Sequence, residues 1–302
     1  MIDIAKVSKN FGKTAALKNI DLKINNGEIV GFAGLNGAGK STAIRIISGI
    51  IFPSSGNIAI NGHDIVREKM EASKHIGWVP ESPNFEPETS SLSLLKYYAG
   101  FYGIKSKDAE IKAEELLKKL NIWDARNKRL SNYSMGMKKR FSIVAAMIGD
   151  PDNYLFDETL NGLDPQGVKD MRDLMLEMKK NGKAVFLSSH ILSELQNIAD
   201  RIAIIKNGEI IKIIDRKDLS NLGGTPSINI KIKNSDNNVI NLLNKFGETT
   251  KNDNIYTIKA PDLSEDDSSK INKYMIDNGY DVISVSYAGE ELEEYFLNLV
   301  RN

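Results

Sequence analysis

The chain has 302 residues, enough for one large domain or two of moderate size. Its 40 Lys and Arg residues balance 40 Asp and Glu residues, so no overall field favours nucleic acid or an anionic membrane. The lack of cysteine excludes disulfides, thiolate metal sites and cysteine nucleophiles. The longest apolar runs fall short of the roughly 20 residues of a membrane helix. The first residues lack the pattern of a signal peptide, so we expect a cytoplasmic protein.

The first two thirds of the chain alternate between strand and helix patterns. Alternating apolar residues predict strands over 2–4 and 20–24, and an Asn26-Gly27 turn leads into a short buried strand over 28–33. The Asn207-Gly208 pair predicts a hairpin near the end of this part. The other elements expected, in chain order, are a helix over 42–50, strands over 58–60 and 74–79, helices over 91–121 and from Ser134, a strand over 154–157, a helix over 165–180 and a strand over 184–188.

A turn-rich segment, Asn221 to Pro226, predicts a boundary between a domain over 1–220 and a small domain over 225–302. The second part mixes short strands with short helices, ending in a helix over 290–300, which indicates an α+β domain. From Thr225 onward it carries 8 basic and 13 acidic residues, so we expect no nucleic-acid partner.

A glycine-rich segment carries the strongest functional signal. It fits the phosphate-binding pattern G-x-x-x-x-G-K-[ST] between an expected strand and an expected helix. Glycines let backbone N–H groups surround an anion, and the helix adds the positive end of its dipole. Lys40 can then reach the terminal phosphates, and Ser41 can ligate Mg²⁺. The residues expected to bind nucleotide here are Gly34, Leu35, Asn36, Gly37, Ala38, Gly39, Lys40, Ser41 and Thr42.

Further motifs follow in a fixed order. They are Tyr133-Ser134-Met135-Gly136-Met137 before a helix, an apolar strand ending in Asp157-Glu158, the Asn161-Gly162-Leu163-Asp164 turn, and Ser188-Ser189-His190. In this order, residues 1 to about 220 resemble the nucleotide-binding subunit of ABC transporters, most of all the stand-alone subunits of ABC exporters with a C-terminal extension.

This resemblance implies a P-loop NTPase of the α/β class with a mixed sheet, an antiparallel β subdomain and a helical subdomain at about 85–150. It implies ATP hydrolysis with Mg²⁺, a second copy or a homologous subunit as dimer partner, and a separate membrane permease that holds the chain at the inner face of the cell membrane. Two other functions stay open. One is a soluble ABC ATPase in translation, repair or assembly, and the other is a regulatory binder that does not hydrolyse ATP.

Acidic residues at the end of the 154–157 strand are the candidate chemical groups. Asp157 can hold Mg²⁺, and Glu158 can act as general base or orient the attacking water. The alternative for this pair is a cap on a turn. His190, which would otherwise be a structural residue, is implied by the resemblance to contact the γ-phosphate.

Residues near the expected helix at Ser134 have roles implied by the resemblance. Ser134, Met135 and Gly136 would contact the ATP held by a second subunit, although Ser134 can also serve as a helix N-cap. Asp164 would link the two sites, or cap the helix that begins at Pro165. Phe11 would stack on adenine, unless it packs in the core.

The sequence departs from the family pattern at several positions. Glu81 stands where most members have Gln, and it can reach Mg²⁺ or lie in a solvated loop. Met135 and Met137 replace a Gly and a Gln of the signature. Thr159 replaces the usual Pro after the glutamate, which affects the loop rather than the carboxylates.

Overall fold

The computed structural model describes residues 1–163, 165–219, 226–236, 238–261, 263–288, 296 and 299. The chain divides into two compact units, Met1–Arg216 and Lys217–Asn302. The turn-rich segment 221–225 lies outside the described residues, as does Asp164.

A six-stranded sheet forms the centre of the first unit, in the order β10-β9-β3-β8-β7-β6. Its parallel strands β3, β7 and β8 consist of buried residues, which suits strands covered on both faces. β9 and β10 form the expected hairpin at one edge. The strand bounds are β3 Ile29–Ala33, β6 Ile76–Val79, β7 Asn153–Asp157, β8 Ala184–Ser189, β9 Arg201–Lys206 and β10 Glu209–Asp215.

A second, antiparallel sheet of the first unit has the order β2-β1-β4-β5. Apolar side chains from this sheet, from helix α1 and from the central sheet form one core, so α1 is packed between the two sheets. The bounds are β1 Ile2–Phe11, β2 Thr14–Ile24, α1 Lys40–Ile47, β4 Ser55–Ile60, β5 His63–Asp64 and α2 Lys69–Lys74. The expectation of a strand from residue 74 was wrong at its start, because α2 continues to Lys74 and β6 begins at Ile76.

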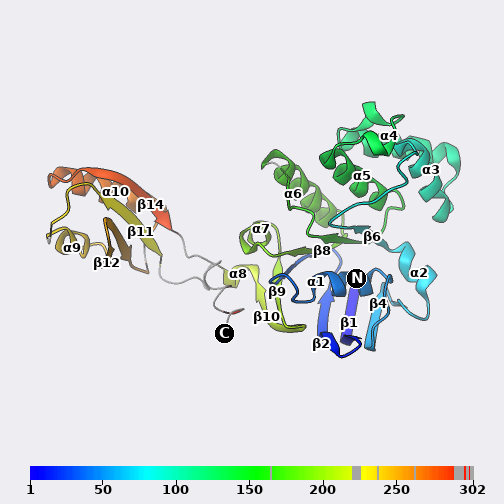
Figure 1. Cartoon of the computed structure of the whole chain (residues 1–302), viewed down its shortest axis with the longest axis horizontal. Coiled ribbons are helices and arrows are strands. Elements are labelled where there is room, and N and C mark those ends of the chain that lie inside the picture. The colour runs from blue at the N-terminus through cyan, green and yellow to red at the C-terminus, as the bar shows by residue number, and fades with distance from the viewer. Residues whose placement is uncertain are drawn as a thin grey trace. The chain divides into compact units, whose positions relative to one another are not determined.

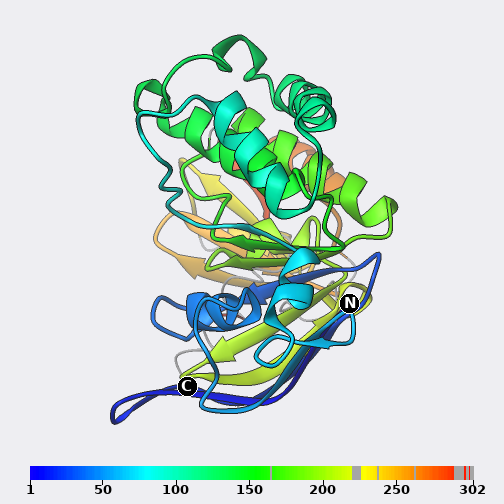
Figure 2. The ribbon, with the colours of Figure 1, turned by 90° about the vertical axis from the view of Figure 1, so that its right-hand side faces the viewer.

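A helical subdomain lies at the opposite end of the first unit from the antiparallel sheet, with the central sheet between them (Figure 1; Figure 2). It contains α3 Ser91–Phe101, α4 Ser106–Lys119 and α5 Met135–Met147, with short 3-10 turns at Trp123–Ala125 and Leu130–Asn132. These helices have an apolar core of their own. Helices α6 Pro165–Lys180, α7 Leu192–Gln196 and α8 Arg216–Leu219 follow later in the chain.

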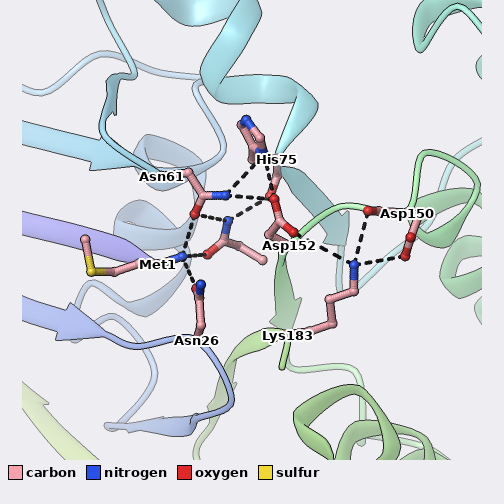
Figure 3. A network of polar contacts seen from close by, with 8 residues as sticks. Met1, Asn26, Asn61, His75, Asp150, Asp152 and Lys183 are labelled. Carbon is pink, nitrogen blue, oxygen red and sulfur yellow. Dashed lines mark hydrogen bonds and ion pairs between the residues drawn. The ribbon is translucent and has the colours of Figure 1, made fainter. Parts of the chain in front are cut away.

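A polar network joins the antiparallel sheet to the start of β7 (Figure 3). The α-amino group of Met1 donates to the Oδ1 atoms of Asn61 and Asn153 at 2.5 and 2.8 Å. The Asp152 carboxylate accepts from Asn61 Nδ2 and lies against His75 Nδ1, both at 2.7 Å. Burial lowers the pKa of the Met1 amine, and the nearby Asp152 opposes that shift. The network pairs polar groups that the contact between the two sheets would otherwise bury alone.

The described part of the second unit contains a four-stranded antiparallel sheet in the order β12-β13-β11-β14, together with helices α9 and α10. Ile228, Ile230 and Ile232 alternate along β11 into a core that also contains Tyr256 and Ile271. This is an α+β arrangement, as the residue pattern predicted. The helix expected over 290–300 lies largely outside the described residues. The bounds are β11 Ser227–Ile232, α9 Asn238–Leu243, β12 Glu248–Asn252, β13 Ile255–Lys259, α10 Glu265–Asp277 and β14 Val282–Ala288.

Among the described residues, none of the helices combines the length and the apolar character needed to cross a membrane.

Candidate nucleotide site

The glycine-rich loop connects β3 to the first turn of α1. Gly39 has a φ of 114°, and a Cβ atom there would lie 2.7 Å from the carbonyl oxygen of Ala16. A Cβ atom at Gly34 would meet the carbonyl oxygen of Ile205 at 2.6 Å. Neither position accepts a side chain, so glycine at both allows the loop to pack closely, as a loop that surrounds an anion with its backbone must.

Lys40, the first residue of α1, is buried, with only 4% of its surface exposed. Its Nζ atom donates to the carbonyl oxygens of Gly34 and Leu35 at 2.6 and 3.2 Å. It also lies 3.0 Å from Oε1 of Glu158. The lysine therefore closes the loop onto itself and carries a buried carboxylate as its counterion.

Glu158 is held from three sides. Besides Lys40 on Oε1, its Oε2 atom accepts from Asn161 Nδ2 and lies against His190 Nδ1, both at 2.7 Å. Burial opposes the charge, but the hydrogen bonds from Lys40 and His190 outweigh it, so the pKa of Glu158 lies below its ordinary value. The carboxylate is thus ionised and oriented.

The backbone of Glu158 has a φ of 48°, a left-handed conformation that non-glycine residues seldom adopt. A proline at position 159 would restrict the backbone of residue 158 to extended conformations. With Thr159 in place of the usual proline, the backbone of Glu158 can adopt this left-handed conformation. Strain of this kind is typical of functional positions.

Asp157 lies at the end of β7, behind the first turn of α1. Its Oδ1 atom accepts from Ser188 Oγ at 2.9 Å and from Ser41 Oγ at 3.2 Å. Burial raises the pKa of Asp157 above its ordinary value, against the effect of these two hydrogen bonds. A buried carboxylate next to a hydroxyl is a set of hard oxygen donors, so the residues present fit Mg²⁺.

These groups surround a cavity of about 440 Å³. Of the predicted site residues, Asn36, Gly37, Gly39, Lys40, Ser41, Thr42, Glu81, Glu158 and His190 line it. Gly34, Leu35, Ala38 and Asp157 lie outside its lining. Gly34 and Leu35 contact Lys40, and Asp157 contacts Ser41, so these three lie next to the cavity. Ala16 and Asn161 line the cavity and were missed by the sequence reasoning. Asn161 could have been found from its spacing, three residues after Glu158.

Phe11 and the signature residues do not line this cavity. Phe11 ends β1 with 51% of its surface exposed, and Lys9 Nζ lies 5.0 Å from its ring centroid. Ser134 caps α5 by accepting from Met137 N–H at 3.3 Å, while Met135 and Gly136 lie exposed in the first turn. The signature residues therefore present a helix N-terminus to the surface.

The phosphate-binding loop after β3, together with an acidic pair at the end of β7, defines a P-loop nucleoside triphosphatase site. The family model described as ABC transporter matches residues 17–161. The chain belongs to the ABC transporter family, as an ATP-binding subunit with ATPase activity.

One relative extends this likeness over nearly the whole chain, and another covers about three quarters of it. The bacitracin transport ATP-binding protein BcrA of Bacillus licheniformis is 30% identical, covering 99% of this chain and 97% of the relative. The linearmycin resistance ATP-binding protein LnrL of Bacillus subtilis is 33% identical, covering 77% of this chain and 75% of the relative.

Two solved structures have the same fold as the first unit. One, of an ATP-binding subunit of an ABC transporter, is 28% identical with a TM-score of 0.69, covering 73% of this chain and 92% of that one. The other is a dimeric ATP-binding cassette in a post-hydrolysis state with ADP and phosphate bound. It is 25% identical with a TM-score of 0.66, covering 72% of this chain and 99% of that one. The α/β fold predicted from the sequence is thereby confirmed.

Proposed function

We propose that this chain hydrolyses ATP in a head-to-tail dimer and powers an exporter through a separate membrane permease. Within one chain, Lys40 and the loop N–H groups bind the phosphates, and Phe11 stacks on the adenine. Glu158 orients the attacking water or accepts its proton, and His190 contacts the γ-phosphate. The dense contacts around Glu158 support this assignment, because they fix its carboxylate before substrate arrives.

Ser41 and Asp157 would hold Mg²⁺, with Glu81 close by in the same cavity. The ion would neutralise charge that develops on the phosphoryl oxygens. The protein itself holds two oxygen donors, Ser41 Oγ and Asp157 Oδ1, next to the phosphate loop. Ser188 fixes the Asp157 carboxylate by donating to the same oxygen as Ser41.

The exposed N-terminus of α5 is the observation that supports the proposed dimer. The helix N-terminus at Ser134, Met135 and Gly136 is exposed and lies outside the cavity of its own chain. It is an anion-binding element that can reach a phosphate only on another molecule. A second copy that supplies it would complete the site, and Asp164, six residues after Glu158 in the sequence, is proposed to link the two sites.

Cross-linking between two copies tests this arrangement, and the cysteine-free chain gives no background. The exposed Leu35 in one copy and the exposed Met135 in the other are replaced by cysteine, in a Glu158→Gln background. We expect a disulfide-linked dimer with ATP and Mg²⁺ but not with ADP. A matched control places the cysteine at exposed Met70 instead of Met135. Equal cross-linking at both positions, or none with ATP, would refute the head-to-tail dimer.

The relatives support the exporter, since one carries the name of a bacitracin transport protein and another that of a linearmycin resistance protein. We propose that the permease holds the chain at the inner face of the membrane. A tagged chain purified from gently solubilised membranes should retain a polytopic membrane protein. Recovery with ribosomes or DNA instead would favour a soluble ABC ATPase.

A further inference from the structure

We propose that the fold selects Asn36, in the phosphate-binding loop, for spontaneous deamidation, and that bound nucleotide protects it. An asparagine that precedes glycine is prone to cyclise, because glycine has no side chain to hinder the approach of its backbone nitrogen to the asparagine amide. The chain contains seven such pairs, which begin at Asn26, Asn36, Asn61, Asn161, Asn181, Asn207 and Asn278. The structure distinguishes the pair at Asn36 from the other six.

Each of the other six pairs has a hydrogen bond on one of the two groups that would react. In three of them the side-chain amide donates, from Asn61 to Asp152 at 2.7 Å, from Asn161 to Glu158 at 2.7 Å and from Asn278 to the carbonyl oxygen of Tyr274 at 2.8 Å. In the other three the glycine N–H donates to a carbonyl oxygen, from Gly27 to Gly182 at 3.1 Å, from Gly182 to Lys179 at 2.9 Å and from Gly208 to Ala38 at 3.0 Å. Cyclisation at these pairs must first break a bond that the fold makes.

The pair at Asn36 lacks both kinds of restraint. Asn36 and Gly37 are the central residues of a turn that closes where Ala38 N–H donates to the carbonyl oxygen of Leu35 at 3.1 Å. In the part of the chain that the structure describes, neither the Asn36 amide nor the Gly37 N–H has a hydrogen-bond partner. Both residues are exposed and line the nucleotide cavity, so water reaches them.

The space around Gly37 is open as well. Its φ is 82°, and apart from its neighbours in the chain no described heavy atom lies within 4 Å of the position that a Cβ atom would take. At Gly39, two residues later, the same position is crowded by the carbonyl oxygen of Ala16 at 2.7 Å. The segment that must move during cyclisation is therefore the part of the loop against which nothing packs.

The reaction consumes only water. The backbone nitrogen of Gly37 bonds to Cγ of Asn36 while the bond from Cγ to Nδ2 breaks, and the amide leaves as ammonia with the proton of the Gly37 N–H. Water then opens the resulting succinimide ring at either carbonyl. One product is aspartate, and the other is isoaspartate, in which the backbone is lengthened by the Cβ atom.

Either product would damage the phosphate site. Each adds a negative charge to a loop that is proposed to surround phosphates with N–H groups, and isoaspartate also changes the path of the loop. Bound ATP should slow the reaction, because a phosphate oxygen that accepts from Gly37 N–H would keep this nitrogen away from Cγ of Asn36. Protection and the loss of binding rest on the proposed function, whereas deamidation without nucleotide does not.

Peptide mapping by mass spectrometry tests the selection on the folded full chain, held at mildly alkaline pH. We expect Asn36 to convert about five- to tenfold faster than the other six, which must each break a hydrogen bond. Asn26 is the matched control, because trypsin leaves both pairs in one peptide, 24–40, where fragmentation separates them. In urea all seven should convert at similar rates. Equal rates in the folded chain, or a preference for Asn36 that persists in urea, would overturn the proposal.

Nucleotide provides the second measurement. In a Glu158→Gln background, ATP with Mg²⁺ should slow conversion at Asn36 several-fold and leave the exposed Asn181 unaffected. ATP binding without this protection would overturn the second part of the proposal. A chain that does not bind ATP would refute the proposed function, while the comparison of the seven pairs would still judge the site.

Loss of affinity is followed by calorimetric titration during the same incubation. Chains converted at position 36 should bind ATP about tenfold more weakly or worse. Asn36→Ser has no amide to cyclise, so its own affinity for ATP should stay constant over the incubation. A decline in Asn36→Ser as fast as in the wild type would show that conversion at this position is not what impairs binding.

Discussion

Lys40 Nζ and Glu158 Oε1 form a buried ion pair at 3.0 Å. Each of the two side chains is therefore the counterion of the other. A bound phosphate would compete with Glu158 for the ammonium of Lys40. Binding of ATP would then release the carboxylate toward water, so substrate binding itself would prepare the group proposed to act on the γ-phosphate.

Substitutions of the two partners should have different effects. Lys40→Ala removes a charged donor and should weaken ATP binding about tenfold to a hundredfold. Glu158→Gln keeps the shape of the side chain and frees Lys40. It should retain ATP binding while turnover falls about 10²- to 10⁴-fold. Calorimetric titration and phosphate release measure the two effects. A Glu158→Gln protein that hydrolyses ATP at the normal rate would remove Glu158 from its role.

A chain of contacts leads from α5 to Glu158, because Lys139 donates to the carbonyl of Asn161 and the Asn161 amide donates to Glu158. Asn161→Ala should lower kcat about tenfold with little change in KM. Since the amide of Asn161 lowers the pKa of Glu158, its loss should also move the acidic limb of the kcat profile to higher pH.

Lys139→Met should act in the same direction, with Lys138→Met on the same helix as the matched control. An unchanged pH profile in Asn161→Ala would show that Asn161 has only a structural role.

The burial of Asp157 should lower the stability of the fold at neutral pH, although the proposed function needs its charged form to bind Mg²⁺. Its pKa is raised from an ordinary value of 3.8, so its protonated form favours the fold. That stabilisation is present at low pH and is lost as pH rises through the raised pKa. At neutral pH, Asp157→Asn should therefore raise the free energy of unfolding by about 0.5–2 kcal/mol in EDTA.

With Mg²⁺ and ATP the order should reverse, because the wild type gains a ligand for the ion and Asp157→Asn loses it. Thermal denaturation in both buffers checks this. A less stable Asp157→Asn protein in EDTA would contradict the assignment.

If Phe11 stacks on the adenine base, its removal should affect binding of the base and not of the phosphates. Phe11→Ala should weaken ATP binding by about 1 kcal/mol or more and leave the binding of inorganic triphosphate unchanged. Phe52, which is exposed to a similar extent at 53%, provides the control, and Phe52→Ala should affect neither ligand. Equal losses for ATP and triphosphate would indicate a general effect on the loop.

Local patterns in the sequence predicted the parts of the site that depend on neighbouring residues. The glycine spacing located the phosphate loop, and the apolar runs located the strand that ends at Asp157 and the strand that His190 follows. The contact of Glu158 with Lys40 was not predictable, because it depends on side-chain directions after distant strands have paired. The short helix α2 was missed since its six residues carry no apolar repeat. A cavity lined by Ile143 of α5, Leu174 of α6 and Thr159 depends on how the two helices pack, which no single segment encodes.

The order of strands in the central sheet has a consequence for folding. β3, β8 and β7 are neighbours in space, yet more than a hundred residues separate β3 from either of the other two. The phosphate loop and the acidic pair can come together only after these remote segments have joined. Affinity for ATP should thus appear only late in folding, and a newly made chain that captures nucleotide has already paired these remote strands.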